Sequence, residues 1–308
     1  MSKVALITGA TGKQGGAVVS ALLGAKAPGY TILGLTRNPE SASAQKLVAK
    51  GVKLVKGDMS DSAAIFEEAK KVVSEPIWGV FSVQMPPMGK SGATQIEENL
   101  GKALIDAALA NGVKVFVQTS VDRHGEKSID NPTDVPHFIS KHNIEKYLIE
   151  KAGDKMSWTI LRPVAFMDSQ NSTPDFGGKA FHTAWRTQVK DKPLQLVAVK
   201  DIGWFGAQAL LHSDEDAYKN KAISLAGDEL TFEQANETLK KFTGTDLPQT
   251  YGFVTSALSW AIKDLGLMFR WFYNEGYAAN IPELKKLHPG LLNFEQFLEQ
   301  ESKYTAKP

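Results

Sequence analysis

The stretch VALITGATGKQGGAVVSALL, residues 4–23, predicts a strand, a tight glycine turn and an amphipathic helix. Gly9, Gly12 and Gly15 are spaced by three residues at the turn. Side chains at these positions would keep a diphosphate away from the backbone amides, and the helix that follows would direct its unpaired N–H groups at the anion. Between a strand and a helix, the motif predicts a dinucleotide-binding loop rather than a turn without a ligand. The expected contacts are Gly9, Thr11, Gly12, Lys13, Gln14 and Gly15.

The end of the second predicted strand distinguishes between the two common dinucleotides. An acidic residue there binds the ribose 2′-hydroxyl of NAD, whereas a basic residue accommodates the 2′-phosphate of NADP. Residues 34–38 contain no acid and include Arg37, whose planar guanidinium suits a phosphate. We therefore predict NADP(H), the alternative being a solvated surface arginine. Two further cofactor contacts, Asp58 and Met59, follow the third strand; Asp58 either accepts from the adenine amino group or caps the next helix.

Short apolar runs alternate with helical patterns over the first 160 residues. The predicted strands are 4–8, 31–35, 54–55, 78–83, 113–118 and 158–161, and the predicted helices are 15–23, 42–49, 62–73, 96–110 and 139–151. This alternation predicts an α/β protein with a doubly wound parallel sheet, the Rossmann fold. We expect residues 1–163 to form an NADP-binding domain. The less regular residues 164–308 are expected to form mainly a smaller substrate or lid lobe, with elements that return to the sheet.

The composition of the 308 residues argues against several classes of function. Lys and Arg total 35 against 34 for Asp and Glu, so no general charge favours nucleic acid or an anionic membrane. The absence of cysteine excludes disulfides and thiolate chemistry, and the six histidines show no spacing typical of a metal site. No segment offers the roughly 18 unbroken apolar residues of a membrane span, and no signal peptide is evident. We expect a cytoplasmic protein without a metal, membrane or nucleic-acid partner.

Several segments together resemble the NmrA-like family of atypical short-chain dehydrogenase/reductases. They are TGATGKQGG, the arginine after the second strand, KGDMSD, HFISKHNIEKYL and TILRPVAFMD. The similarity covers most of the chain and is best over the first 165 residues. It implies one of two kinds of protein. Some members are NADP-dependent reductases of small molecules, including C=C and C=N bonds, and others bind NADP(H) as redox sensors or transcriptional co-regulators.

The resemblance also implies catalytic residues. In the wider superfamily, a Tyr-x-x-x-Lys pair on a helix supplies an acid and a lysine that binds the nicotinamide ribose. Lys141 matches the lysine, unless it is simply a solvated helix residue, but His137 stands where the tyrosine would be. His137 is one helical turn from Lys141 and is suited to proton transfer near neutral pH, or else is an exposed residue at the start of the helix. Ser120, after the fifth strand, either binds a substrate oxygen or caps the next segment.

Family members place further residues near the cofactor. The resemblance implies that Val83 and Gln84, at the end of the fourth strand, contact the adenosine and the nicotinamide ribose. The apolar loop Met85–Met88 is expected to border the nicotinamide, and Phe166 to pack on the cofactor or the substrate.

Two functions fit these residues. The first is an NADPH-dependent reductase of a small organic substrate. The missing tyrosine favours C=N or C=C reduction over reduction of a simple ketone, because an iminium group already carries charge and needs little help from an acid. The second is a non-catalytic NADP(H)-binding redox sensor or transcriptional co-regulator that acts through a protein partner and shuttles to the nucleus. A homodimer is a further expectation.

Overall fold

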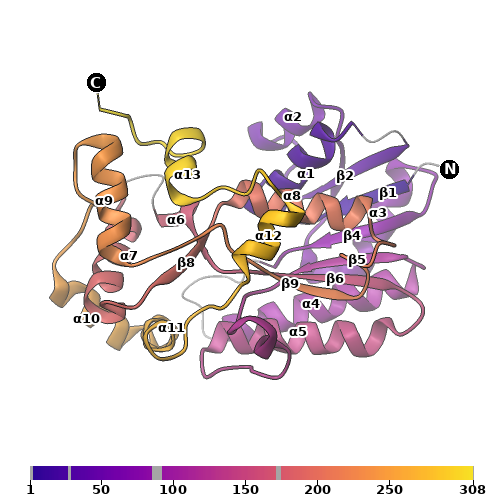
Figure 1. The fold of residues 1–308 in the computed structure, drawn as a ribbon. Helices are drawn as coiled ribbons and strands as arrows, with labels where there is room; N and C mark the ends of the chain where they lie inside the picture. Colours follow the sequence, from indigo (N-terminus) through magenta and orange to yellow (C-terminus); the bar gives the residue numbers. More distant parts are fainter. Residues whose placement is uncertain (1–2, 27–28, 85–91, 171–174, 308) are drawn as a thin grey trace. The chain divides into compact units, whose positions relative to one another are not determined.

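A computed structural model of the chain describes residues 3–26, 29–84, 92–170 and 175–307 (Figure 1). The larger sheet contains seven strands: β1 (Lys3–Ile7), β2 (Tyr30–Thr36), β3 (Lys53–Lys56), β4 (Ile77–Ser82), β5 (Val115–Thr119), β6 (Ser157–Pro163) and β9 (Lys221–Leu225). They are ordered β3-β2-β1-β4-β5-β6-β9, and the neighbours from β3 to β6 pair in parallel. The chain therefore starts in the middle of the sheet and winds outward in both directions, which confirms the predicted Rossmann-like fold. The winding direction changes between β1 and β4, where such sheets bind ligands.

Helices cover both faces of this sheet (Figure 1). They are α1 (Lys13–Gly24), α2 (Ala42–Val48), α3 (Ser62–Val72), α4 (Ala93–Ala110), α5 (Pro136–Ala152) and α8 (Val199–Leu211). Helices α1 and α8 lie on one face, and α4 and α5 lie on the other. Glycines allow both pairs to pack closely: a Cβ on Gly203 would lie 2.5 Å from Ala17, and one on Gly101 would lie 2.6 Å from Ile144. Coverage on both faces explains why strands such as β5 are buried at every residue and do not alternate in polarity.

The chain divides into two compact units. The first contains residues 1–120, 140–162 and 202–223, and therefore most of the parallel sheet; the second contains residues 121–139, 163–201 and 224–308. The second unit has a three-stranded sheet in the order β10-β8-β7. Its strands are β7 (Ala165–Phe166), β8 (Leu194–Val197) and β10 (Asp228–Leu230). Its helices are α6 (Met167–Gln170), α7 (Phe176–Ala184), α9 (Phe232–Thr243), α10 (Gly252–Ala261), α11 (Lys263–Asn274), α12 (Ile281–Leu287) and α13 (Phe294–Gln300).

Three short helical turns connect these elements: η1 (Met59–Asp61), η2 (Gly125–Ile129) and η3 (Trp185–Val189). The core of the second unit is rich in aromatic rings, among them Trp185, Phe269 and Phe294. Burial of these rings supplies the apolar contact area that the short strands of this unit cannot provide by themselves.

Candidate functional site

The glycine turn after β1 has the geometry of an anion-binding loop. Gly9 adopts a left-handed conformation with φ of +58°. Gly12 precedes α1 and offers no side chain to cap the helix. A Cβ on Gly15 would lie 2.4 Å from the backbone carbonyl oxygens of Thr8 and Gly9. The turn is therefore limited to glycine by its own backbone, and the first N–H groups of α1, which starts at Lys13, receive no cap from Gly12.

A pocket of about 260 Å³ opens at this turn. Its lining comes from the ends of β1, β2, β3 and β4 and from α4: Gly9, Thr11, Gly12, Leu35, Thr36, Arg37, Gly57, Asp58, Met59, Val83 and Leu100. The structure thus brings together seven of the predicted cofactor contacts. Leu100, which the sequence did not indicate, lies on α4 and reaches this pocket only through the tertiary fold.

Arg37 and Asp58 lie on neighbouring segments of the pocket lining. The Arg37 side chain is 84% exposed, and its Nε lies 3.9 Å from Oδ2 of Asp58. Asp58 accepts a hydrogen bond from the backbone N–H of Ser60 at 2.9 Å and so caps the turn η1, while Asp61 caps α3. Hydrogen bonds from Ser60, assisted by the charge of Arg37, lower the pKa of Asp58. Asp58 therefore caps the short turn η1, whereas the following helix α3 is capped by Asp61, and a contact between Asp58 and adenine stays a prediction.

Two side-chain hydrogen bonds fix the strand ends around the loop. The backbone N–H of Val83 donates to Oγ1 of Thr8 at 2.8 Å and ties β4 to the end of β1. The Thr119 hydroxyl donates to Oε1 of Gln14 at 2.7 Å and ties β5 to the first turn of α1. The side chain of Gln14 therefore stabilises the loop, and a contact between Gln14 and the cofactor stays a prediction.

Gln84 is buried, and its side chain forms hydrogen bonds with residues of β4 and β5. Its amide donates to the Ser82 hydroxyl at 2.6 Å, and the amide of Gln118 donates to its oxygen at 2.8 Å. These bonds satisfy both ends of the Gln84 side chain. The loop Met85–Met88 that follows lies outside the described residues.

Lys141 is held by a carboxylate on the neighbouring helix. Its Nζ lies 2.9 Å from Oε1 of Glu97 on α4, and the two side chains are only 12% and 3% exposed. The hydroxyl of Ser140 donates to the other oxygen of Glu97. Lys141 is therefore not the solvated helix residue that the sequence left open. Its low exposure and its carboxylate partner fix the ammonium group in place.

Ser120 belongs to a second buried polar group. Its hydroxyl donates to Glu145 on α5, and Glu145 also forms a bidentate ion pair with Arg162, with Nη2 of Arg162 at 2.7 Å. Glu145 and Arg162 are almost fully buried. The sequence predicted a substrate contact or a cap for Ser120 and did not anticipate this bond. Glu145 follows Lys141 by four residues and therefore lies on the same face of the helix. This spacing was the only signal in the sequence that Glu145 belongs near the candidate site.

His137, in the first turn of α5, pairs with an aspartate from a distant part of the chain. Its Nδ1 lies 2.6 Å from Oδ1 of Asp264 on α11, and each side chain is 34% exposed. The sequence left open whether His137 is simply an exposed residue; it is partly buried and has a carboxylate partner. Asp264 was missed because 127 residues separate it from His137.

Two further residues, Tyr147 and Phe166, complete the set of candidates. Tyr147 donates to Asp106 from an exposed position, and this bond raises the pKa of the phenol, so it supplies no acid beside Lys141. Phe166 ends β7 in the second unit and is partly buried. Within the described ranges, no three His, Asp or Glu side chains are grouped as metal ligands. No helix in the same ranges is long and apolar enough to cross a membrane.

Comparisons with known proteins agree with this architecture. The profile of the NmrA-like family matches residues 1–298. The NmrA-like family domain-containing oxidoreductase FrzB of Cladobotryum sp. is 28% identical over 188 residues, which are 58% of this chain; the match spans about half, 52%, of FrzB.

Two solved structures share the fold over nearly the whole chain. The triphenylmethane reductase of Citrobacter sp., complexed with NADP(H), is 18% identical with a TM-score of 0.73, over 97% of this chain and 99% of that one. NmrA, a negative transcriptional regulator in complex with NADP, is 17% identical with a TM-score of 0.66, over 97% and 95% of the two chains.

Proposed function

This chain belongs to the NmrA-like family, and from that membership we propose that it is an NADPH-dependent reductase of a small organic molecule. The observation that carries the proposal is the glycine turn that opens into a pocket containing Arg37. A Cβ on Gly15 would collide with the backbone of the turn, so this geometry exists only with glycine. FrzB is named an oxidoreductase, and the triphenylmethane reductase was solved in complex with NADP(H). Both relatives support the same class of activity.

The residues of the pocket fit NADPH. The turn from Gly9 to Gly15 and the start of α1 would bind the diphosphate through backbone N–H groups, because the helix dipole and the uncapped amides favour an anion there. Arg37 would bind the 2′-phosphate through its exposed guanidinium. Asp58, Met59 and Val83 would enclose the adenosine. Bound NADPH supplies the hydride for the reaction.

Lys141 is proposed to bind the nicotinamide ribose. Its ammonium group has three donors, of which the Glu97 carboxylate takes at least one, so donors remain for ribose hydroxyls. We assign to Ser120 a contact with substrate through the acceptor capacity of its hydroxyl, since its proton is directed to Glu145. Gln84 and Phe166 are proposed to contact the cofactor or the substrate, as in the family.

The substrate is proposed to contain an activated C=N or C=C bond. A ketone reductase needs an acid at the carbonyl oxygen, and α5 carries His137 where a tyrosine would supply that acid. An iminium group accepts hydride without a proton, and a conjugated alkene accepts its proton at carbon after hydride addition. We also propose a cytoplasmic location, because a chain without cysteine has no disulfides and fits a reducing compartment.

One experiment tests the cofactor assignment and the activity together. The purified protein is titrated with NADPH and NADH, followed by nucleotide fluorescence, and then supplied with iminium ions, enones, quinones and aldehydes. Arg37→Ala should lower the affinity for NADPH by about tenfold or more and leave that for NADH unchanged, since a bidentate phosphate contact is worth about 1.5–3 kcal/mol. Arg186→Ala, at an exposed arginine of the second unit, is the matched control and should change neither. An unchanged nucleotide preference in Arg37→Ala contradicts the assignment.

A sensor function is the second candidate, and the absence of a tyrosine before Lys141 favours it. In that case the protein binds NADPH with the same residues and acts through a protein partner. It would then form a homodimer or a complex with a regulatory protein. NADPH would then change the oligomeric state or the partner affinity, and no acceptor in the panel would be reduced.

A further inference from the structure

Helix α10, in the second unit, exposes a large apolar face. The three most exposed large apolar side chains among the described residues all lie on or beside this helix: Tyr251 at 73%, Phe253 at 74% and Trp260 at 88%. Within the helix itself, Thr255 is the one residue that is buried. Residues 247–262 contain no charged side chain. The exposed face is therefore neutral as well as apolar.

The opposite face of α10 is closely packed. Thr255 and Ser259, four residues apart, lie on that face. The Ser259 hydroxyl lies 3.0 and 3.1 Å from the side-chain amide nitrogen and oxygen of Gln188 in η3. A Cβ on Gly266 of α11 would lie 2.3 Å from the carbonyl oxygen of Ser259, so the two helices approach as closely as their backbones allow. These contacts fix which side of α10 faces outward.

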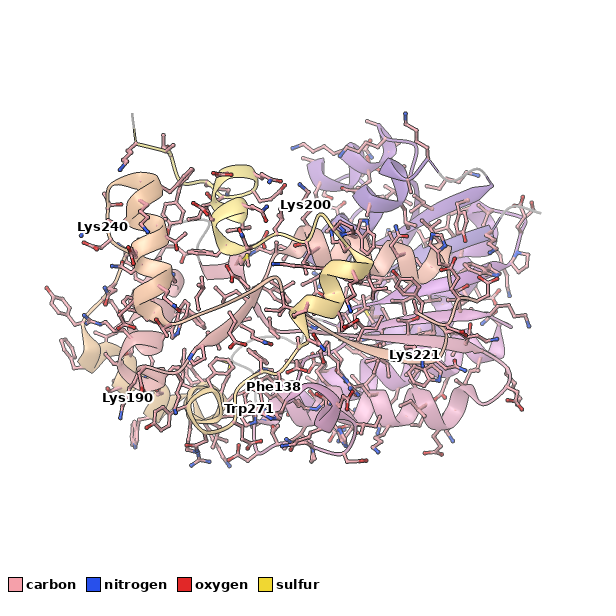
Figure 2. The ribbon with its side chains drawn as sticks, viewed as in Figure 1. Phe138, Lys190, Lys200, Lys221, Lys240 and Trp271 are labelled. Carbon is pink, nitrogen blue, oxygen red and sulfur yellow. The ribbon has the colours of Figure 1, made fainter. Side chains whose placement is uncertain are left out.

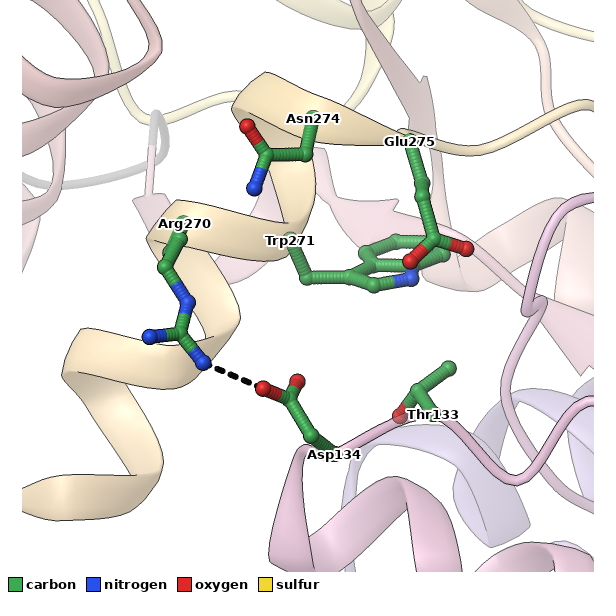
Figure 3. A pocket seen from close by; sticks show the side chains of 6 residues that line it. All are labelled: Thr133, Asp134, Arg270, Trp271, Asn274 and Glu275. Carbon is green, nitrogen blue, oxygen red and sulfur yellow. Dashed lines mark hydrogen bonds and ion pairs between the residues drawn. The ribbon is translucent and has the colours of Figure 1, made fainter.

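Helix α11, which supports α10, is itself fastened to residues 131–138. Arg270 pairs with Asp134 beside an open, polar pocket of about 500 Å³ (Figure 3). Phe138 and Trp271 meet edge to face with their ring centroids 5.2 Å apart, and both are labelled in Figure 2. Because its support is held at several points, the backbone of α10 needs little rearrangement to bind a partner, which lowers the entropic cost of association.

Phe253, Ala257 and Trp260 follow one another at i, i+4 and i+7, so they form one stripe along the outer face of α10. We propose that this stripe is the contact between two copies of the chain, related by a two-fold axis through Ala257. A two-fold interface brings the same surface of both copies together, and an uncharged surface does not repel its own copy. With the helices antiparallel, the small Ala257 side chain lets the backbones approach, and Phe253 packs against the partner subunit's Trp260.

The area of this face suits a homodimer. An aromatic side chain has about 150–250 Å² that packing can bury, so the three exposed rings present roughly 400–500 Å². A stable interface buries about 800 Å² per partner. The half-exposed Ile262 and the partly buried Val254 and Leu258 extend the face towards that value. The proposal goes beyond the proposed function, because it holds for a reductase and for a sensor alike.

Sedimentation equilibrium of the purified chain without nucleotide measures the association. We expect a dimer with a dissociation constant of about 1 μM or lower. Phe253→Glu and Trp260→Glu each place a charge beside its own copy and should raise the dissociation constant at least about thirtyfold. Val48→Glu, at an exposed apolar residue of α2, is the matched control and should leave it unchanged. Urea unfolding and NADPH titration check that each variant is folded.

An introduced thiol tests the position of the axis, since the chain has no cysteine. Ala257→Cys should form an intermolecular disulfide on mild oxidation, because the axis places this residue beside its own copy. Ala42→Cys, at the exposed start of α2, is the control and should not. A mixture of Phe253→Lys and Trp260→Glu should form a heterodimer, because opposite charges then meet across the interface.

Several outcomes would overturn the proposal. A wild-type chain that stays monomeric at about 100 μM does so, since that concentration is far above the expected dissociation constant. A dimer that survives both glutamate variants does so too, as does an Ala257→Cys chain that cross-links no faster than Ala42→Cys. A monomer that sediments with anionic vesicles through Trp260 would make α10 a membrane contact instead. A monomer whose KM for a reducible acceptor rises in Trp260→Glu would make it a wall of the substrate site.

Discussion

Replacing Gly15 with alanine should damage both stability and cofactor binding, although alanine is the better helix former. The new Cβ would lie 2.4 Å from the carbonyl oxygens of Thr8 and Gly9, and reaching even 3.0 Å requires the backbone to retreat by about 0.6 Å. Overpacking of this kind lowers the free energy of unfolding by roughly 1–3 kcal/mol, and the higher helix propensity of alanine offsets about 1 kcal/mol of this loss. Because rigid backbone on both sides is affected, we expect a net loss of about 2 kcal/mol in the free energy of unfolding. The affinity for NADPH should fall at least about tenfold, which corresponds to about 1.4 kcal/mol.

The same helix provides the control. Gly24, the last residue of α1, has no atom within 4 Å of a built Cβ, and its φ is not positive. Gly24→Ala should therefore stabilise the protein by about 0.5–1 kcal/mol and leave NADPH binding unchanged. Urea unfolding followed by circular dichroism gives the stabilities, and fluorescence titration gives the affinities. If Gly15→Ala unfolds at the wild-type urea concentration and binds NADPH normally, the reasoning about the glycine turn is wrong.

Three further predictions follow from the buried polar groups. Glu145→Ala should cost ~3–5 kcal/mol in urea unfolding, since it leaves Arg162 buried without its carboxylate, and a loss below about 1 kcal/mol would contradict the pairing. Glu97→Gln should weaken NADPH binding severalfold in titration, with the neighbouring Glu98→Gln as control, because Lys141 loses its charged partner. Burial lowers the pKa of His182 from 6.5 to about 4, so between these values the unfolded chain binds a proton that the folded one does not. Stability should consequently fall by about 1.5 kcal/mol from this group between pH 6.5 and 5, and His182→Gln should remove that part of the pH dependence in urea titrations at the two pH values.

The fold was predictable because its signals are local. The strand and helix patterns of the first unit appear in the sequence, and the observed elements differ from the prediction mainly at their ends. Helix α5 begins at Pro136 rather than Ile139, since proline is well suited to the first position of a helix and its missing N–H costs nothing there. Thr231 caps α9 through a reciprocal capping box with Gln234, which is a local arrangement of two residues three positions apart.

The candidate site was predictable only in part. The sequence by itself determined the glycine turn and Arg37, because the backbone geometry of a tight turn and the charge at a strand end are properties of a few neighbouring residues. The tertiary structure alone decided which carboxylates meet the candidate catalytic groups: Glu97 for Lys141, Glu145 for Ser120 and Asp264 for His137. Apolar spacing specifies which face of a helix is buried, but it does not specify which polar side chain of another element will lie opposite. Those pairings depend on how α4, α5 and α11 pack within their units, and that is a property of the folded chain.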